Sequence, residues 1–167
     1  HPVPVVVVDP VMVATSGDRM LSADAEAALR QLVADHATVV TPNIPELAVL
    51  TDEPEPDSFD AAVELGQRYA READVQVLVK GGHLSGERAS NALVAPDGTT
   101  HVAEAPRVAT KNTHGTGCSL SSALATRMAL GSATDAVSWA SEWLHEAIAH
   151  ADELHVGQGH GPCLLYT

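Results

Sequence analysis

Short runs of β-branched residues alternate with stretches of helical spacing, and this alternation most constrains the fold of the chain. A continuous β-branched run at 3–9 and valine-rich segments at 37–41 and 75–80 predict strands, and the segments at 23–34 and 58–72 predict the helices between them. Strands that are joined through helices run parallel, with right-handed crossovers. We therefore expect an α/β fold, with the run at 3–9 buried on both faces of a mostly parallel sheet.

Polar side chains stand where each of these three strands ends. Asp9 follows the first strand, Asn43 and Glu46 follow the second, and Lys80 ends the third. The carboxyl ends of parallel strands open onto one edge of a sheet, where α/β proteins place their ligands. Asn43 and Glu46 have the spacing of a helix capping box, which the sequence favours, and the same residues could also supply oxygen ligands to Mg²⁺. Lys80 could extend to solvent or contact a phosphate.

A glycine-rich stretch at 110–118 leads into a helix that carries an apolar stripe of Leu120, Leu124 and Met128. Gly115 and Gly117 let the backbone approach a ligand, and the free N–H groups of a helix start attract anions. Cys118 would lie in the first helical turn, and Gly131 is expected to end the helix.

Several interpretations of this stretch stay open. It could be a simple helix cap with a buried cysteine, or a site that binds phosphate at the helix start. Paired with His114, Cys118 could act as a hydrolase nucleophile. A dinucleotide-binding turn is disfavoured because the third glycine is missing, and a P-loop is excluded because no lysine follows Gly117.

The remaining segments predict a hairpin of strands at 89–94 and 99–103 and a last helix that ends near residue 151. Ser132 or Thr134 would cap that helix. The tail at 156–162 is rich in Gly and His. The spacing of His145, His150 and His155 scatters them around a helix, so we interpret them as solvated residues and not as metal ligands.

Composition excludes several classes of protein. The 167 residues suffice for one core, and nine basic against 22 acidic residues give a formal charge of −13. That charge argues against partners such as nucleic acids or anionic membranes, but not against a small anionic ligand. Two cysteines indicate free thiols in a reducing, cytoplasmic compartment. No segment is apolar for long enough to span a bilayer, and the first residues do not form a signal peptide.

Five motifs taken together resemble hydroxymethylpyrimidine/phosphomethylpyrimidine kinases of thiamine biosynthesis. They are Asp9–Asp18, Thr41–Glu46, Val79–His83, Asn112–Cys118 and Gly159–Pro162, in family order and spacing. The resemblance implies a ribokinase-like three-layer α/β/α fold. It also implies transfer of the ATP γ-phosphoryl group to a hydroxymethylpyrimidine and then to its monophosphate.

The resemblance also implies roles for individual residues. Gly115, Thr116 and Gly117 would form the anion hole for the transferred phosphoryl group, and Cys118 would stand where related kinases carry a catalytic Asp. The other implied contacts are Lys80, Lys111 and Thr113 with ATP, Asp9, Asn43 and Glu46 with Mg²⁺ and water, and Val11 with the pyrimidine.

Members of the family carry a long region before their Asp-Pro-Val-Met segment, and this chain begins close to that segment. We therefore expect residues 1–167 to be one kinase domain that lacks the N-terminal part, with an exposed apolar edge at the first strand. Family members tend to form homodimers, and we expect the same here. The alternatives are a pyridoxal-type kinase of the same superfamily and a nucleotide-binding remnant without activity.

Overall fold

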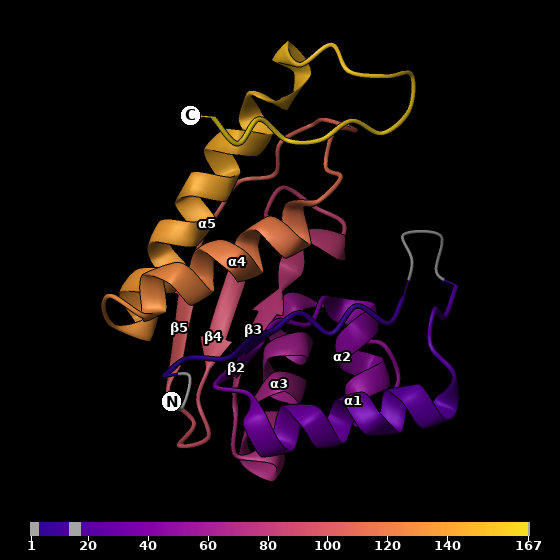
Figure 1. Cartoon of the computed structure of the whole chain (residues 1–167), viewed down its shortest axis with the longest axis vertical. Helices are drawn as coiled ribbons and strands as arrows, with labels where there is room; N and C mark the ends of the chain where they lie inside the picture. The colour runs from indigo at the N-terminus through magenta and orange to yellow at the C-terminus, as the bar shows by residue number, and fades with distance from the viewer. Residues whose placement is uncertain (1–3, 14–17, 167) are drawn as a thin grey trace.

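The computed structural model describes residues 4–13 and 18–166 of the chain (Figure 1). Residues 3 and 14–17, which fall within the predicted first strand and the loop after it, lie outside the described residues. The elements follow one another as β1 (Val7–Val8), α1 (Ala23–His36), β2 (Val39–Val40), α2 (Ile44–Thr51), α3 (Phe59–Ala73), β3 (Gln76–Lys80), η1 (Gly81–His83), β4 (Asn91–Val94), β5 (Thr100–Ala103), α4 (Thr116–Met128), α5 (Ala133–Ala149) and η2 (Ala151–Glu153).

The five strands form one mixed sheet in the order β1-β2-β3-β4-β5. β1, β2 and β3 run parallel, with Val7 opposite Val39 and Val39 opposite Gln76. β4 and β5 are the predicted hairpin, and both of their pairings, β3 with β4 and β4 with β5, are antiparallel. The parallel half therefore brings the carboxyl ends of β1, β2 and β3 to one edge.

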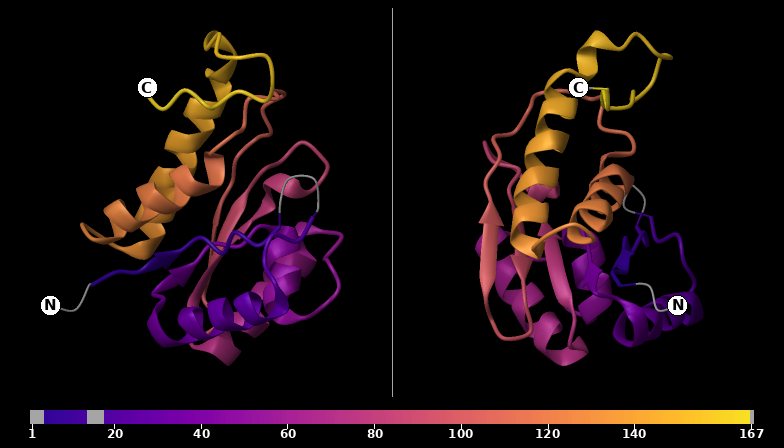
Figure 2. Two further views of the ribbon diagram at one scale, coloured as in Figure 1. Left: turned by 45° about the vertical axis from the view of Figure 1, so that its right-hand side comes forward. Right: turned by 60° about the vertical axis from the view of Figure 1, so that its left-hand side comes forward.

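Helices cover both faces of the sheet, which confirms the three-layer arrangement (Figure 2). One core lies between the sheet and α1, α2 and α3, and it includes Val40, Val77 and Val79. The other lies between the sheet and α4 and α5, and it includes Val39 and Leu78. Neighbouring strand residues thus point into opposite cores, which is why the buried positions of these strands are apolar in succession.

The helix starts agree with the predictions from local sequence. Ser22, Asn43, Ser58 and Ser132 are the N-caps of α1, α2, α3 and α5, and each side chain accepts a backbone N–H from the first turn. These bonds satisfy donors that have no partner within the helix, so they set where each helix begins.

The expectations for β1 agree with the structure: Val8 packs against one core and Val7 against the other, and β1 is the edge strand of the described sheet. Both residues are half-buried, because β1 pairs with β2 alone. Another expectation was wrong in detail. Gly131 does not cap α4: the helix ends at Met128, and no left-handed φ occurs at Gly131. Leu120 and Leu124 do form the buried stripe of α4, with Met128 at its margin.

The contact of α3 with the sheet depends on Gly66. A Cβ atom at this position would lie 2.6 Å from Cγ2 of Val79, which is buried in β3. We predict that Gly66→Ala lowers the free energy of unfolding by about 1 kcal/mol, because overpacking costs about 1–3 kcal/mol and alanine recovers about 1 kcal/mol of helix propensity. Urea unfolding measures the difference.

The matched control is Gly131→Ala, because nothing lies within 4 Å of a Cβ at that glycine. We expect the control to change stability by less than about 0.5 kcal/mol. An unfolding midpoint for Gly66→Ala equal to that of the wild type would contradict the close packing of α3 on β3.

Candidate active site

The polar side chains at the ends of β1, β2 and β3 meet, as their positions in the sequence predicted. Lys80 Nζ donates a hydrogen bond to Asp9 Oδ1 at 3.0 Å, and it lies 4.0 Å from Glu46 Oε2. The side chains of Lys80, Asp9 and Glu46 are only 12%, 14% and 4% exposed. Lys80 does not extend to solvent; it is a nearly buried ammonium group beside two carboxylates.

The capping box at the start of α2 places Glu46 in this cluster. The Asn43 N–H donates to Glu46 Oε2 at 2.8 Å, and the Glu46 N–H donates to Asn43 Oδ1 at 2.9 Å. Asn43 also pairs with Lys80 in a parallel bridge. The predicted cap is therefore confirmed, and the same carboxylate that completes it faces Lys80. The two interpretations of Asn43 and Glu46 are structurally compatible.

Thr41 and Ser121 tie the cluster to α4, and sequence reasoning assigned neither of them a role. Thr41 is fully buried, and its hydroxyl donates to Asp9 Oδ1 at 3.2 Å and lies 2.9 Å from Ser121 Oγ. The Ser121 hydroxyl in turn donates to the Gly117 carbonyl oxygen. These contacts join residues 80 positions apart, so no local pattern could have revealed them.

The glycine loop brings the start of α4 against the cluster. Gly115 is the N-cap residue, with a φ of +82° that a residue with a side chain rarely adopts. At Gly117, a Cβ atom would lie 3.4 Å from Lys80 Nζ and 3.6 Å from Asp9 Oδ2. The first turn of α4 contains no acidic residue. An ammonium group and the positive end of a helix thus face the same place.

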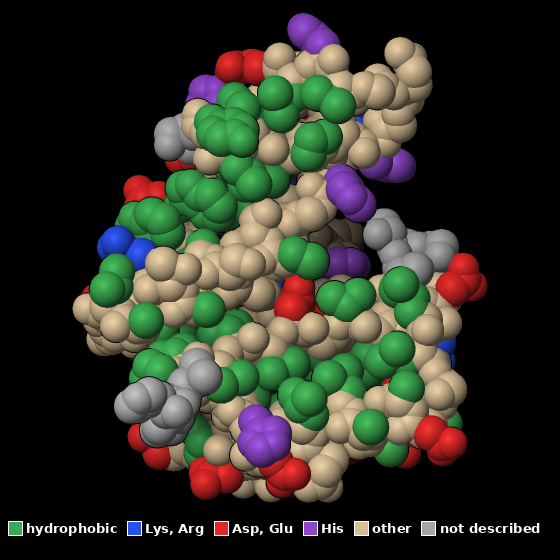
Figure 3. Space-filling view, in the orientation of Figure 1, with side chains coloured by type: hydrophobic (Ala, Val, Ile, Leu, Met, Phe, Trp, Pro, Cys, Tyr) green, Lys and Arg blue, Asp and Glu red, His purple; other side chains and the backbone are tan. Residues whose placement is uncertain are grey.

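The other predicted site residues lie around this centre. Cys118 is an exposed free thiol in the first turn of α4, and Val11 is 44% exposed. The Thr113 carbonyl oxygen accepts the Thr116 hydroxyl at 3.0 Å, so the contribution of Thr113 is to shape the loop. Figure 3 shows that this face is hollowed beside the N-terminal end of α4, with an acidic side chain at the hollow.

Lys111 lines a cleft of about 960 Å³ that lies between the approach to the glycine loop and the C-terminal tail. Backbone and polar side chains from both segments form its walls, including Thr110, Asn112 and Asp152. Its lining includes Ala109 to Asn112, the residues that lead into the glycine loop. Lys111 thus stands apart from the Lys80 cluster, in a place where a second part of one ligand could bind.

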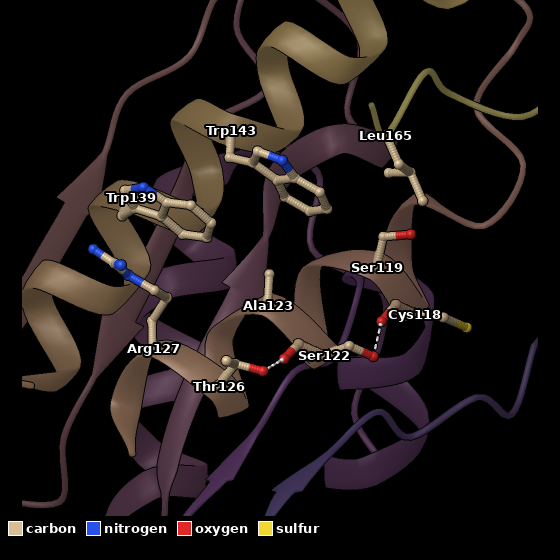
Figure 4. A pocket seen from close by; sticks show the side chains of 9 residues that line it. All are labelled: Cys118, Ser119, Ser122, Ala123, Thr126, Arg127, Trp139, Trp143 and Leu165. Carbon is tan, nitrogen blue, oxygen red and sulfur yellow. Dashed lines mark hydrogen bonds between the residues drawn. The ribbon is translucent and has the colours of Figure 1, made fainter. Parts of the chain in front are cut away.

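A different cleft, of about 550 Å³, lies between α4 and α5 (Figure 4). Trp139 and Trp143 stack with their ring centres 5.9 Å apart, and the Arg127 guanidinium lies 4.4 Å from the centre of the Trp139 ring. In Figure 4 the Cys118 side chain points away from these rings. Cys118 also lines this cleft, but none of Lys80, Asp9 and Glu46 does, and no acidic side chain of the described residues is in the lining.

Two ionisable groups, Glu46 in the cluster and His83 beside it, have shifted pKa values. Burial raises the pKa of Glu46 above its usual value, although the Asn43 N–H and Lys80 act in the opposite direction. Partial burial, together with Lys80, lowers the pKa of His83, which follows Lys80 in the turn η1. The sequence motif included His83 but assigned it no role. A neutral imidazole beside Lys80 adds no further positive charge there.

The donor set fits a divalent cation that is shared with a phosphate. Glu46 offers a buried carboxylate and Asp9 a largely buried one, and Mg²⁺ typically takes one or two carboxylates together with phosphate oxygens and water. Within residues 4–13 and 18–166, no group of three or more His, Cys, Asp or Glu side chains could hold a metal by itself. A bound phosphate would supply the remaining ligands.

Comparison with known proteins identifies the family. Residues 1–164 match the family described as phosphomethylpyrimidine kinase. A thiamine biosynthesis multifunctional protein of Corynebacterium efficiens is 58% identical over 158 residues, which cover 94% of this chain and 21% of that protein. The hydroxymethylpyrimidine/phosphomethylpyrimidine kinase of Escherichia coli is 44% identical, and the match covers 94% of this chain and 59% of that protein.

Among solved structures, an ADP complex of Bacillus subtilis pyridoxal kinase matches with a TM-score of 0.82 and 31% identity, over 94% of this chain and 58% of that protein. The helix-covered sheet with a glycine loop at its carboxyl edge is the ribokinase-like α/β fold, as predicted. The chain belongs to the phosphomethylpyrimidine kinase family. No helix in its described part is both long and apolar enough to cross a membrane.

The raised pKa of Glu46 predicts how stability depends on pH. The folded state holds the Glu46 proton more tightly than the unfolded state, so the resulting stabilisation is complete below pH 4.5 and is lost as pH rises through the folded pKa. Glu46→Gln removes the titratable carboxyl group, so the variant does not lose this stabilisation as pH rises. We therefore predict that the variant becomes more stable relative to wild type as pH rises from 4.5, as measured by urea unfolding at several pH values.

Glu64→Gln, an exposed substitution of the same type on α3, controls for the loss of one acidic group. A stability difference between Glu46→Gln and wild type that stays constant across this pH range would show that Glu46 does not titrate differently on folding.

Proposed function

We propose that this chain handles the nucleotide and the transferred phosphoryl group in an ATP-dependent kinase whose acceptors are 4-amino-5-hydroxymethyl-2-methylpyrimidine and its monophosphate. The observation that carries the proposal is the approach of Gly117 to the Lys80–Asp9 ion pair at the start of α4. Family membership and the E. coli relative, named as a kinase of this type, support the choice of reaction.

In this proposal the positive groups neutralise the phosphates. Lys80 contacts an ATP phosphate, and the backbone N–H groups of Gly115, Thr116 and Gly117 receive the transferred phosphoryl group. The nucleoside lies toward the cleft at Lys111, with Thr113 shaping the loop between the two places. Phosphoryl transfer depends mainly on positioning and charge neutralisation, which a nearly buried ammonium at a helix start can provide.

The carboxylates would hold the divalent cation. Asp9 and Glu46, with Asn43 holding Glu46 in place, would bind Mg²⁺ and its water molecules, and the ion would neutralise charge on the phosphate oxygens. Asp9 also keeps Lys80 oriented until a phosphate is present. Val11, exposed after β1, would contact the pyrimidine.

Cys118 would serve the acceptor hydroxyl. That oxygen attacks the γ-phosphorus, the bond from the γ-phosphorus to the β–γ bridging oxygen breaks, and ADP leaves. The hydroxyl proton passes to the Cys118 thiolate, which lies exposed in the first turn of α4. The proposal further includes a homodimer, because members of the family tend to dimerise, and a cytoplasmic location, which the two free thiols favour.

A pyridoxal-type acceptor is the second candidate, because the B. subtilis pyridoxal kinase shares the fold at 31% identity. Phosphorylation assays with both acceptors separate the two candidates. Preferred turnover of pyridoxal would overturn the pyrimidine assignment. Nucleotide binding without turnover of either acceptor would assign the 167-residue chain a binding role only.

Nucleotide binding is the direct test of the Lys80 cluster. We predict that Mg·ADP at about a hundred times its dissociation constant raises the free energy of unfolding by about 2.7 kcal/mol. Lys80→Ala should abolish this gain, because the phosphates lose their ammonium partner. Arg88→Ala, which removes only an exposed ion pair with Glu104, should retain it. An equal gain in Lys80→Ala would refute the assignment.

Kinetics of two Cys118 variants test whether Cys118 accepts the proton of the acceptor hydroxyl. If the thiolate accepts the proton, Cys118→Ala should lower kcat by roughly 10²–10⁴-fold, with little change in KM for ATP. Cys118→Asp should recover part of the loss because a carboxylate can also accept a proton. Cys163→Ala removes the buried thiol instead and serves as the control. Unchanged turnover in Cys118→Ala would leave Cys118 no role as a base.

A further inference from the structure

The C-terminal tail binds the loop that leads into α4, although the two segments are 49 residues apart. The Gly161 N–H donates to Asn112 Oδ1 at 2.9 Å, and the Gly161 carbonyl oxygen accepts the His114 N–H at 3.1 Å. His114 and Pro162 also form a parallel bridge. Asn112 and His114, which come just before Gly115, thus bind both the N–H and the carbonyl group of Gly161.

The Asn112 side chain is satisfied at both ends. While its oxygen accepts from Gly161, its Nδ2 donates to Asp152 Oδ1 at 2.8 Å. The Thr110 hydroxyl donates to the same Asp152 oxygen, and the Asn112 N–H donates to Thr110 Oγ1 at 3.1 Å. A carboxylate can only accept from the amide and a backbone N–H can only donate to it, so one orientation of the Asn112 amide satisfies both partners.

Contact between the tail and Asn112 leaves no space for a side chain at position 161. A Cβ atom on Gly161 would lie 2.6 Å from Asn112 Oδ1 and 3.0 Å from Asn112 Cγ. Gly161 is buried, in contrast to the exposed residues before it in the tail. The glycine is therefore required by close packing against the amide, and a larger residue would push the tail and the loop apart.

We propose that Asn112, Asp152 and Gly161 form a clamp that positions the glycine loop for phosphate binding. The clamp holds the residues directly before Gly115, where α4 and its N–H groups begin. N–H groups that stabilise a phosphoryl group are effective only when they are held in place beforehand. These three are positioning residues, and this inference rests on the proposed function, because it assigns the clamp to that same phosphate site.

The first experiment compares Gly161→Ala with Gly131→Ala, a glycine with nothing within 4 Å of its Cβ position. Calorimetry measures the affinity for Mg·ADP, and hydrogen exchange measures protection of the His114 amide. We expect Gly161→Ala to weaken Mg·ADP binding at least tenfold and to speed exchange at His114 at least tenfold. Gly131→Ala should stay within twofold of wild type in both measurements.

The second experiment uses Asn112→Asp and varies pH. The variant keeps an acceptor for Gly161 but sets a second carboxyl group against Asp152. Two adjacent carboxylates repel each other until they share a proton. We expect Mg·ADP affinity, taken relative to wild type at each pH, to be low at about pH 8 and to recover toward about pH 5.5. The ratio to wild type cancels the other titratable groups of the three segments, Lys111, His114, His150, Glu153, His155 and His160.

The outcomes separate the clamp from the proposed function. Two results would overturn the clamp. One is Mg·ADP affinity and His114 exchange within twofold of wild type in Gly161→Ala. The other is a ratio of Asn112→Asp affinity to wild-type affinity that does not change with pH. Should Gly161→Ala fail to unfold cooperatively, the pH series of Asn112→Asp decides. Failure of the wild type to bind Mg·ADP would reject the proposed function and with it the clamp's role in phosphate binding. Exchange at His114 would then still show whether the clamp holds the loop.

Discussion

One ammonium group, that of Lys80, determines how the parts of the site fit together. It is almost withdrawn from water, which is tolerable only because Asp9 and Glu46 provide compensating charge. Each carboxylate is in turn held by the end of β2, Asp9 through Thr41 and Glu46 through the Asn43 N–H. A phosphate can replace a carboxylate as partner of this ammonium because it offers the same kind of charge.

The chain reconciles an anion site with a formal charge of −13 by separating the two in space. Most of its acidic residues are exposed, whereas the glycine loop faces Lys80 and the positive end of α4. A Cβ atom at Gly117 would already be in van der Waals contact with Lys80 and Asp9, so the helix start lies directly against the ion pair. The Ser121–Thr41 contact anchors the helix start to the end of β2, so hydrogen bonds fix this close approach.

Much of the fold followed from local patterns, because these elements are stabilised by interactions between near neighbours. The capping box of Asn43 and Glu46, the serine caps and the β4–β5 hairpin are of this kind. Apolar strands alternating with helices also predicted which strand ends meet. The roles of Asn112, Asp152 and Thr41 could not be predicted, since their partners lie 40, 40 and 80 residues away and leave no periodic signal. The half-burial of Val7 and Val8 could not be predicted from their apolar run alone, because such a run does not reveal how many neighbours a strand has.

The short pairing of β1 with β2 has a consequence for how Asp9 is held in the site. β1 contributes two residues to the edge of the described sheet, and Asp9 follows directly after it. Local opening of such a strand costs far less free energy than global unfolding, because few contacts break. Loss of Asp9 from the site would leave Lys80 beside Glu46 alone, so the pairing of β1 with β2 controls the charge around the ammonium group. A ligand that needs Asp9 therefore also favours the paired state of β1, because binding favours the conformation that it requires.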